Sequence, residues 1–596
     1  MNLSDYIVDY LIKQGVRHVF GYPGGMVTHL MDSLSIREGE IQAHLTHHEQ
    51  GAAFAACGYA QAINALGVAF ATSGPGATNL ITGICNAYFE SVPVLFITGQ
   101  VNTFESAEGK AVRQCGFQET DIVSMVRSVT KFVAYVEDAR KIRYYLDKAV
   151  FEACHGRKGA VLLDIPMNIM RAEVDPDALV PYKAEEAADA GDAAGGAEQI
   201  LMELRRAERP VFLFGNGIKS SGVEMLARKL MTRFQVPVVT SMIAVDIPGA
   251  CPQFFGFIGA YGNRAANFIV AKADLLVSFG SRLDIRQVGK QRENFAPHAK
   301  IIRIDIDKGE LAYKVHEDEF AIRADVGEVL KILCGERLEK SYDAWLEICG
   351  FIRARTEGRD EREPNIRMNS FFDVLPRHSL LCVDVGQNQV WAAQAAVKAG
   401  NHRLLFSGSN GAMGYALPAA VGACIATGET TYVITGDGGL QMNIQELQTV
   451  VREQLPVKIM ILNNNALGMI RHFQEMYFKK RYCMTVKGKG FSNPDFGKIA
   501  RAYGIDYRLV DGERQKQWFQ DCPGPEILEL SLEGDTFVFP KLEYGRPNQD
   551  QEPLLDREEY RLLMDDKALL EEIRKDRGER AEIAAYPTRG EKAQNN

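Results

Sequence analysis

Short apolar runs bounded by glycine, proline or asparagine alternate with helical patterns through most of this 596-residue chain. Typical runs are GVAFA at 67–71, VLFITG at 94–99 and YVITG at 432–436. Continuous apolar strands separated by helices are typical of parallel sheets that helices cover on both faces. The sequence therefore predicts an α/β fold class that is repeated along the chain.

Two changes in composition divide the chain. Residues 182–197 are rich in alanine, glycine and acidic residues, and residues 353–367 are rich in charged residues, so we predict a linker at each. The divisions leave three doubly wound parallel-sheet domains of ordinary size, at 1–180, 190–345 and 365–545. The strongly charged residues 546–596 are predicted to form a C-terminal tail, either a solvated helix or a lid over an active site.

Composition and charge exclude several classes of protein. The chain is 46% hydrophobic, which excludes disorder as its main state, and its net charge of −9 argues against a nucleic-acid partner. No run of about 18 uncharged apolar residues predicts a membrane span, and Asp5 and Asp9 interrupt the N-terminal region where a secretory signal would be apolar. The eleven cysteines form no CxxC pair, as is typical of a reducing compartment. We expect a soluble, cytoplasmic protein with no membrane partner.

The most informative segment is 431–469. One predicted strand ends in a glycine-rich turn around Asp437, and the next strand ends in an asparagine cluster around Asn464, 27 positions later. Both clusters follow the carboxyl ends of neighbouring parallel strands, where open α/β sheets bind ligands. A carboxylate, an amide oxygen and a backbone carbonyl leave room for two phosphate oxygens and a water around Mg²⁺. The sequence therefore predicts a site for a diphosphate and a magnesium ion, with the diphosphate at a helix N-terminus.

A GDG motif followed nearly thirty residues later by NN resembles the cofactor motif of thiamine diphosphate (ThDP)-dependent decarboxylases and carboligases. Over about residues 1–545 the chain looks like the large catalytic subunit of the acetolactate (acetohydroxyacid) synthases. The stretches that carry this resemblance include GYPGG at 21–25, HEQGAA at 48–53, TSGPGATN at 72–79, DVGQ at 384–387 and NNNALGM at 463–469. The resemblance implies a ThDP-dependent transferase of branched-chain amino acid biosynthesis.

The resemblance also implies cofactor contacts in the third domain. Asp437, Asn464 and the carbonyl of Ala466 would bind Mg²⁺, and Met413 would hold the two rings of ThDP in a bent shape. The carbonyl of Gly411 would face the pyrimidine amino group. The other residues expected to contact ThDP are Gly25, Gln387, Asn388, Gly436, Gly438 and Gly439.

Glu49 stands at the start of an alanine- and glycine-rich helical pattern with no carboxylate nearby. A carboxyl group in an apolar pocket can exchange a proton near neutral pH, and the resemblance makes Glu49 the acid that activates ThDP through N1′ of its pyrimidine. The alternative is a glutamate that serves only as a helix first-turn charge. Because Glu49 and Asp437 belong to different domains, the cofactor would bridge them. The resemblance implies a homodimer or homotetramer with active sites at the subunit interface.

The middle domain resembles the FAD-binding domain of acetolactate synthases in PVFLFGNG at 210–217 and VSFGSRLDIRQVG at 277–289. We expect FAD there, although RLDIR departs from the RFDDR of that family. A middle domain without a flavin, as in the catabolic acetolactate synthases, is the alternative. The residues expected to contact FAD are Arg157, Gly215, Gly217, Arg282, Asp284, Arg286 and Asp305.

The chemistry that the resemblance implies starts with pyruvate, which adds to ThDP and loses CO₂. The remaining hydroxyethyl unit is transferred to a second carbonyl substrate, giving 2-acetolactate when the acceptor is pyruvate. Gln118 would lie near the reacting centre. Whether a small regulatory subunit binds is left open, and so are two other readings: an inactive paralogue, and a dehydrogenase that GSNGAMG at 408–414 only loosely suggests.

Three departures from the family concern the acceptor. Phe473 stands where the family has a tryptophan, and the loop before Phe117 is longer than usual and carries Lys110 and Arg113. The ending at 543–555 is also unusual. Together they suggest an acceptor larger or more anionic than pyruvate, such as a keto-sugar nucleotide, but neutral drift in a pyruvate-using enzyme explains them equally well.

Overall fold

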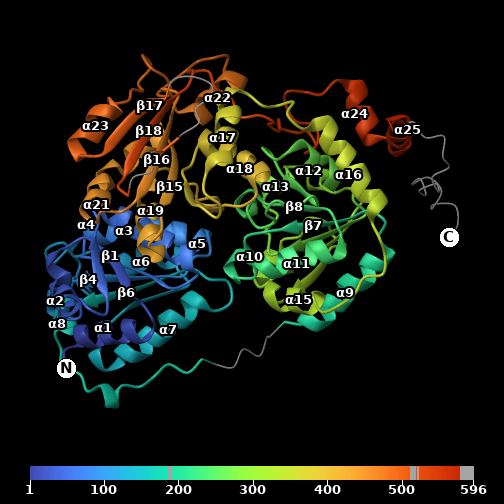
Figure 1. Ribbon diagram of the computed structural model, residues 1–596. Helices are drawn as coiled ribbons and strands as arrows, with labels where there is room; N and C mark the ends of the chain where they lie inside the picture. Colours follow the sequence, from blue (N-terminus) through green and yellow to red (C-terminus); the bar gives the residue numbers. More distant parts are fainter. Residues whose placement is uncertain (185–190, 511–517, 520–522, 577–596) are drawn as a thin grey trace. The chain divides into compact units, whose positions relative to one another are not determined.

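The computed structural model describes residues 1–184, 191–510, 518–519 and 523–576. Its named strands form three six-stranded sheets, and every strand pair within them is parallel (Figure 1). Helices alternate with these strands along the chain. The predicted fold class, a repeated α/β fold built on parallel sheets, is confirmed.

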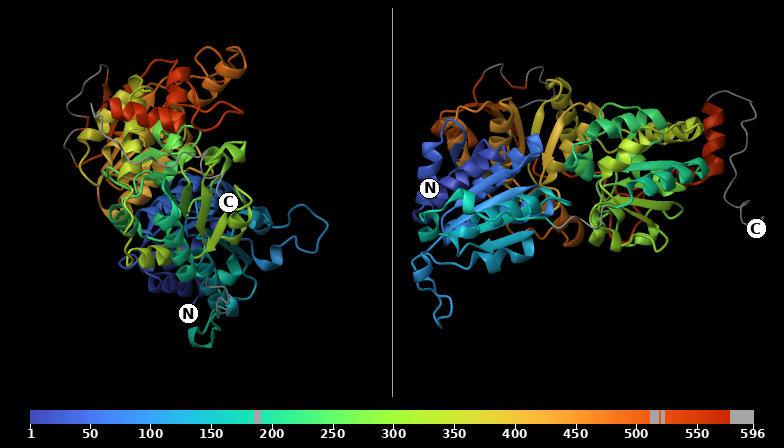
Figure 2. Two further views of the ribbon diagram at one scale, coloured as in Figure 1. Left: turned by 90° about the vertical axis from the view of Figure 1, so that its right-hand side faces the viewer. Right: turned by 90° about the horizontal axis from the view of Figure 1, so that it is seen from below.

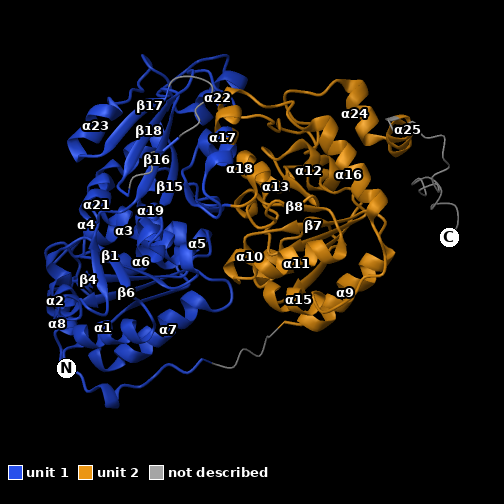
Figure 3. Cartoon of the chain, in the orientation of Figure 1, with its two compact units in different colours: residues 1–189, 370–392, 402–537 blue, residues 190–369, 393–401, 538–596 orange. Residues whose placement is uncertain are grey.

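The chain forms two compact units (Figure 3). Unit 1 carries the first and third sheets and comprises residues 1–189, 370–392 and 402–537. Unit 2 carries the middle sheet and comprises residues 190–369, 393–401 and 538–596. Each unit is built from three separate ranges, so the chain passes between the units more than once. The domain boundaries proposed from the sequence stay predictions.

The first sheet has three fully buried strands near its centre, as their continuous apolar sequences require. Its strand order is β2 (Gln42–Leu45), β1 (His18–Gly21), β3 (Gly67–Ala71), β4 (Val94–Gln100), β6 (Ala160–Pro166), β5 (Phe132–Tyr135). One face packs against α1 (Leu3–Lys13), α2 (Thr28–Ile36) and α7 (Ile142–Cys154). The other face packs against α3 (Glu49–Ile63) and α5 (Ile81–Phe89).

The third sheet, also in unit 1, has the order β14 (Arg403–Phe406), β13 (Leu380–Val383), β15 (Thr431–Gly436), β16 (Val457–Asn463), β18 (Glu526–Ser531), β17 (Asp506–Val510). Its helix α19 (Ala416–Thr427) packs directly on α3 of the first sheet. A Cβ at Gly58 would lie 2.0 Å from the carbonyl oxygen of Ala419, and one at Gly422 would lie 1.8 Å from that of Ala55. Glycine at both positions therefore lets the two helix backbones meet, and this contact joins the two sheets.

The middle sheet, in unit 2, has the order β12 (Phe320–Arg323), β11 (Lys300–Asp305), β10 (Leu275–Phe279), β7 (Pro210–Phe214), β8 (Val238–Thr240), β9 (Phe254–Phe257). Helix α15 (Val326–Leu333) packs against α9 (Ala193–Arg206) and α11 (Glu224–Phe234). A second group pairs α12 (Arg264–Lys272) with α16 (Asp343–Thr356). No helix of the described residues is long and apolar enough to cross a membrane.

The structure describes the two predicted linkers only in part or as helix ends with a short connection. In the first, residues 185–190 lie outside the described residues, and α9 begins at Ala193. The second, 353–367, stays a prediction: it covers the end of α16, the non-helical residues 357–362 and the start of α17 (Glu363–Val374), and a boundary between the two units follows it at 369/370. Trp345 and Ile352 bury the apolar face of α16, while Arg355 on its other face lies 3.1 Å from Glu572. Arg353 and Arg355 of this stretch therefore belong to an amphipathic helix, whereas residues 359–362 belong to the connection between α16 and α17.

The C-terminal segment belongs to the core of unit 2. Helices α24 (Arg557–Met564) and α25 (Asp566–Asp576) bury Leu563 and Leu569 in the same cluster as the middle sheet. Asp566 at the start of α25 also pairs with the buried Lys272, whose side chain is 3% exposed. The expectation of a solvated helix is therefore wrong for the inner face of these helices, and residues 577–596 of the predicted tail lie outside the described residues.

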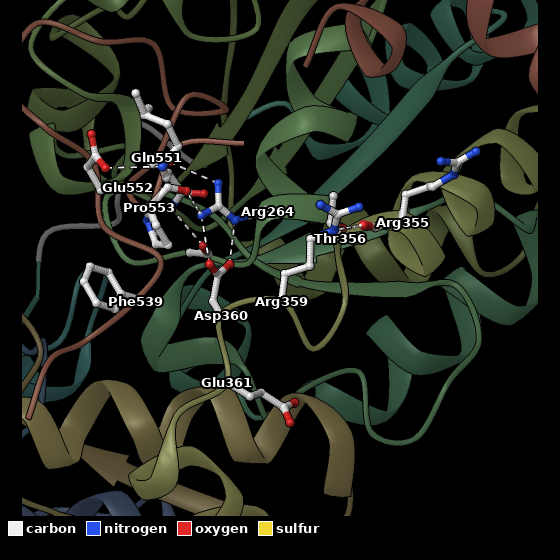
Figure 4. A network of polar contacts seen from close by, with 12 residues as sticks. Arg264, Arg355, Thr356, Arg359, Asp360, Glu361, Phe539, Gln551, Glu552 and Pro553 are labelled. Carbon is white, nitrogen blue, oxygen red and sulfur yellow. Dashed lines mark hydrogen bonds and ion pairs between the residues drawn. The ribbon is translucent and has the colours of Figure 1, made fainter. Parts of the chain in front are cut away.

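A buried ion pair anchors the chain that leads into these helices (Figure 4). The Arg264 side chain is 2% exposed and forms a two-pronged pair with Asp360, at 2.5 and 2.8 Å. The same guanidinium donates to the carbonyl oxygens of Gln551, at 3.1 Å, and Pro553, at 2.6 Å. One side chain thus connects α12, the α16–α17 connection and the C-terminal segment.

We expect Asp360→Ala to destabilise unit 2 by about 3–5 kcal/mol, because it leaves the buried Arg264 without a counter-charge. The midpoint of thermal unfolding is the measurement. Lys498→Ala is the control, because its pair with Asp495 is exposed, at 74% and 53%, and such pairs contribute about 0–1 kcal/mol. Equal shifts in the two variants would contradict the prediction.

Candidate cofactor site

The two polar clusters of the third sheet lie at one edge of it. Strand β15 ends at Gly436, and helix α20 (Asp437–Met442) begins directly after it. Strand β16 pairs with β15 in parallel, with Leu462 opposite Gly436, and ends at Asn463. Asp437 and Asn464 therefore follow neighbouring strands at the same level, as the sequence predicts.

The Asp437 carboxylate is buried, at 2% exposure, and the side-chain amide of Asn493 donates to it. Burial raises the pKa of Asp437 to about 6. Next to it, Oδ1 of Asn493 is buried and makes no hydrogen bond within the described residues. This carboxyl edge therefore has hard oxygen atoms that protein donors only partly satisfy, which suits a small oxygen-preferring cation.

The side-chain amide of Asn464 is oriented by hydrogen bonds to its neighbours. Its Nδ2 donates to Oε1 of Gln387 at 3.0 Å and to the hydroxyl of Thr536 at 2.9 Å, while its Oδ1 accepts from the backbone N–H of Ala466 at 3.2 Å. These bonds orient the amide oxygen toward the turn that carries Ala466. No group of three or more His, Cys, Asp or Glu among the described residues is placed to hold a metal. A magnesium ion here would need oxygens from a bound diphosphate, which fits a cofactor site.

Glycines make the turn after β15 narrow. A Cβ at Gly438 would lie 2.6 Å from Leu467 and 3.5 Å from the methyl of Met413. Met413 therefore lies against this turn, where the resemblance places the residue that bends ThDP. Gly436 and Asn388 are neighbours, since a Cβ at Gly436 would lie 3.5 Å from Oδ1 of Asn388.

Asp384, at the end of β13, is a residue of this site that the sequence analysis did not single out. It is 1% exposed and accepts from the backbone N–H groups of Val385, Gly414 and Ala416 at 2.8, 2.9 and 3.0 Å. It also limits the turn, because a Cβ at Gly439 would lie 2.7 Å from its carboxylate. Asp384 thus fixes the loop of Gly411 and Met413, and the only sequence signal was its place at the start of DVGQ.

Glu49 is the first residue of α3 in the first sheet's domain and is 8% exposed. The side-chain amide of Asn79 donates to its carboxylate at 2.9 Å. The preceding His48 is the N-cap of the helix and accepts from the N–H of Gln50 at 3.0 Å, so the structure gives this histidine a capping role. A buried carboxylate in a helix first turn fits both the activating acid and the helix-charge alternative.

Other predicted residues surround Glu49 in the first domain. Gly25 has open space around its Cα, with no atom within 4 Å of an added Cβ. A Cβ at Gly76 would lie 3.3 Å from the Glu49 carboxylate, and one at Gly74 would lie 2.8 Å from the carbonyl of Gln118. Gln118 has a φ of 63°, so its backbone is held in a conformation that non-glycine residues rarely adopt.

The loop before Gln118 projects from the first sheet (Figure 2). Glu119, for which the sequence suggested no role, holds it: its carboxylate accepts from the N–H groups of Ala107, Cys115 and Gly116. Although partial burial acts to raise the pKa of Glu119, these amides hold it below its usual range. Glu119 thus closes the loop directly beside Gln118.

The residues predicted to contact the acceptor lie in two places in unit 1. Phe117 is 80% exposed, and Lys110 donates to the carbonyl of Ser106 within its own loop at 2.7 Å, with the exposed Arg113 nearby in sequence. Phe473 lies on α22 (Gly468–Tyr477), is 49% exposed and packs on Tyr477. No hydrogen bond among the described residues joins Glu49 to Asp437 or Asn464.

Two of the residues predicted to contact FAD are glycines that shape a loop of unit 2. A Cβ at Gly215 would lie 2.2 Å from the carbonyl oxygen of Gly280. The N–H of Gly217 donates to the same carbonyl at 3.0 Å. Close backbone approach between the segments that follow β7 and β10 therefore accounts for both glycines without a cofactor.

The charged residues predicted to contact FAD also have partners within the protein. Arg282 lies 3.3 Å from Asp284, which caps α13 (Ile285–Val288) by accepting from the N–H of Arg286. Asp305 accepts from the backbone N–H two residues later at 2.9 Å, and Arg157, in unit 1, donates to the hydroxyl of a serine at 3.0 Å. Arginine side chains and the start of a helix can bind phosphate groups, so these residues are compatible with a flavin nucleotide. None of them needs one to explain its position, and FAD stays a prediction.

Unit 2 also has a cavity of about 570 Å³ beside the edge strand β9. Its polar lining side chains bond to each other: Asn365 donates to Gln394 at 2.7 Å, and Gln394 donates to the carbonyl of Phe539 at 2.9 Å. Lys398 pairs with Glu361 in the same lining. These groups tie the C-terminal segment to unit 2, which is a structural role.

Comparison with known proteins agrees with the site. Three domain models of the thiamine pyrophosphate enzymes match the sequence: the N-terminal TPP binding domain at residues 1–125, the central domain at 197–333 and the C-terminal TPP binding domain at 384–521. The chain belongs to the thiamine pyrophosphate enzyme family. Thiamine pyrophosphate is ThDP, so the prediction of this cofactor is confirmed. The residues predicted to contact ThDP and Mg²⁺ lie within the first and third matched ranges.

Similar proteins narrow the family further. The chain is 35% identical to the acetolactate synthase isozyme 2 large subunit of Escherichia coli (strain K12), over 92% of this chain and 99% of that protein. It is 34% identical to the acetolactate synthase large subunit of Pyropia yezoensis, over 91% and 94%, and 35% identical to acetolactate synthase 1, chloroplastic, of Zea mays, over 92% and 88%. The protein is therefore a ThDP-dependent enzyme, a transferase of the carboligase type that resembles acetolactate synthase large subunits, as the sequence predicts.

Proposed function

We propose that the protein is a ThDP- and Mg²⁺-dependent carboligase that decarboxylates pyruvate and transfers the hydroxyethyl unit to a 2-keto acid, giving 2-acetolactate. The observation that carries the proposal is the edge of the third sheet, where Asp437, Asn464 and the carbonyl of Ala466 follow neighbouring strands. The names of the relatives support the reaction. We also propose a cytoplasmic location and FAD in the middle domain.

The chain's own residues would divide the work as follows. Bound ThDP supplies a nucleophilic carbon and takes up the electron pair released with CO₂. Asp437, Asn464 and the Ala466 carbonyl would hold Mg²⁺ and, through it, the diphosphate, while Met413 would set the orientation of the rings. Glu49, buried beside Asn79, would hold a proton at N1′ of the pyrimidine. Gln118 would orient the reacting carbonyl.

The first experiment is an assay with pyruvate, ThDP and Mg²⁺. We expect release of CO₂ together with 2-acetolactate, measured by its conversion to acetoin in acid. Release of CO₂ without acetolactate would contradict pyruvate as the acceptor. It would favour the second candidate, transfer of the same unit to a keto-sugar nucleotide or another carbonyl compound, for which the long loop before Phe117 is the supporting observation.

Loop variants test the acceptor directly. If the acceptor is anionic, we expect Lys110→Ala with Arg113→Ala to raise its KM about tenfold, because two exposed charges contribute about 1 kcal/mol or less each. The rate of pyruvate decarboxylation is expected to stay within about twofold, since chemistry on the donor precedes acceptor binding. Lys141→Ala, an exposed lysine of the same domain, is the control. An unchanged KM for every acceptor tried would argue for a neutral drift of the loop.

We propose a homodimer or homotetramer whose active sites combine Glu49 of one chain with Asp437 of another. Large apolar side chains that are exposed at both half-sites support this assembly, with Phe117 at 80%, Phe473 at 49% and Met484 at 72%. A partner subunit that covers them would also complete the site. A small regulatory subunit is a further possible partner, as the large-subunit names of the relatives suggest.

Mixing two inactive variants distinguishes a shared site from a site within one chain. We expect Glu49→Gln and Asp437→Ala, each nearly inactive alone, to regain about a quarter of wild-type activity after they are mixed under conditions that exchange subunits. The reason is that a mixed dimer would have one site with both changes and one site with neither. No recovery despite proven exchange, measured by native mass spectrometry, would contradict a shared site.

A further inference from the structure

Glu446 is a fully buried carboxylate that the cofactor motif does not use. It ends the short helix η8 (Ile444–Glu446), just after the turn of Asp437, and has an exposure of 0%. Its Oε2 accepts from the hydroxyl of Thr449 at 2.7 Å. Its Oε1 reaches the other sheet of unit 1 and accepts from the backbone N–H of His47 at 2.9 Å. Glu446 therefore binds the chain two residues before Glu49.

The absence of a side chain at Gly51 leaves space for the Glu446 carboxylate. A Cβ at Gly51 would lie 2.4 Å from Oε1 of Glu446, closer than atoms can approach. The position is inside α3, where glycine is less favourable than alanine, and the surrounding turn is rich in alanine. The glycine of the HEQGAA stretch thus has a steric reason, which is the approach of Glu446.

A second hydrogen bond from the same segment reaches α3 at Gln50, the residue after Glu49. The side-chain amide of Asn443 donates to Oε1 of Gln50 at 3.1 Å and to the carbonyl of Gly414 at 2.9 Å. Glu446 and Asn443 belong to the same few residues after the glycine-rich turn. Together they bind the residues on both sides of Glu49, which itself has no hydrogen bond to this segment among the described residues.

We propose that Glu446 is a positioning residue for activation of ThDP: by binding the N–H of His47 across from Gly51, it fixes the first turn of α3 and with it the Glu49 carboxylate. This inference rests on the proposed role of Glu49. A carboxylate that must place a proton on a ring nitrogen has to be held within a fraction of an ångström, and misplacement by about 1 Å can cost about 100-fold in rate.

Four variants test the inference: Glu446→Ala, Glu446→Gln, Gly51→Ala and the double variant Gly51→Ala with Glu446→Ala. Glu446→Gln keeps an oxygen that accepts from His47. Glu453→Ala is the matched control, because Glu453 follows in the same segment but contacts His44, at 3.2 Å, and not α3. The first readout is amide hydrogen exchange of residues 47–52 in the cofactor-free protein, by mass spectrometry. The second is the rate at which bound ThDP exchanges its C2 proton, by NMR after acid quench.

We expect Glu446→Ala to speed amide exchange in residues 47–52 and to slow C2 proton exchange, each by about tenfold or more. Glu446→Gln should stay within about threefold of wild type in both, and Glu453→Ala should leave both unchanged. Gly51→Ala should resemble Glu446→Ala, and the double variant should be no worse than Glu446→Ala alone, because the clash is gone. If Glu446→Ala does not fold, Gly51→Ala and Glu446→Gln decide the question by the same two readouts.

Wild-type rates in Glu446→Ala, or fully additive effects of the two changes, would overturn the inference. Neither readout uses pyruvate, so a failure to form acetolactate would contradict the proposed reaction and leave this result standing. Equal C2 exchange in wild type and Glu49→Gln would instead show that Glu49 is not the activating acid.

Discussion

Glu49→Gln is expected to lower the turnover of pyruvate by about 10²–10⁴-fold, the range that a positioned proton-transfer group contributes. The substitution keeps the size of the side chain and an oxygen that can accept from Asn79, so α3 should remain in place. What it removes is the proton that the carboxyl group would hold at the cofactor. We therefore expect the fall in kcat with little change in the affinity for ThDP.

The measurement combines steady-state kinetics with calorimetric titration of ThDP in the presence of Mg²⁺. Glu38→Gln, an exposed glutamate of the same domain, is the control and should behave as wild type. A Glu49→Gln variant that keeps more than about a tenth of the wild-type turnover would favour the alternative, in which Glu49 serves only as a first-turn charge of α3.

Asp437→Ala is expected to weaken the apparent affinity for Mg²⁺ by about 100-fold or more, and activity should fall with it. Asp437 is the one carboxylate in the proposed donor set, and the other two donors, the Asn464 amide and the Ala466 carbonyl, are neutral. Loss of the only protein charge leaves the cation attracted by the diphosphate alone. Removal of Mg²⁺ from the wild-type protein should lower its activity in the same way.

The experiment is a titration with Mg²⁺ at saturating ThDP after dialysis against a chelator. Asn493→Ala is the matched comparison, because Asn493 donates to the Asp437 carboxylate but is outside the proposed donor set. Residues that only orient a ligand typically cost about 10–100-fold in metal affinity, so its effect should be the smaller one. Equal metal affinity in Asp437→Ala and wild type would remove Asp437 from the metal site.

The strands that could be predicted are those with continuous apolar sequences. Runs such as 94–100 and 457–463 are buried at every position, as continuous apolar strands of a covered parallel sheet are expected to be. The edge strands β2 and β17 were missed because they are short and largely exposed or half-exposed. Strand β18 was missed for another reason: it buries Glu526, whose charge is matched by Arg508 on the adjacent strand, at 3.0 Å.

The sequence also predicted which residues gather at the edge of the third sheet. Two neighbouring parallel strands bring their carboxyl ends together, so the spacing from Asp437 to Asn464 already contained the geometry. The same local reasoning could not separate the helical parts of residues 353–367 from the connection between them, because charges on a packed helix and charges in a connection have the same composition.

The sequence by itself determined the fold class and the cofactor family, and it predicted the pair Asp437 and Asn464, because apolar runs and motif spacing can be seen along the chain. Only the tertiary structure decided what Asp384, Glu119 and Glu446 do. Each is a carboxylate that accepts from at least one backbone N–H group of another segment, and the sequence does not show which N–H groups a carboxylate will meet. Which amides a buried carboxylate meets depends on how distant segments pack, and that packing is what the folded chain adds.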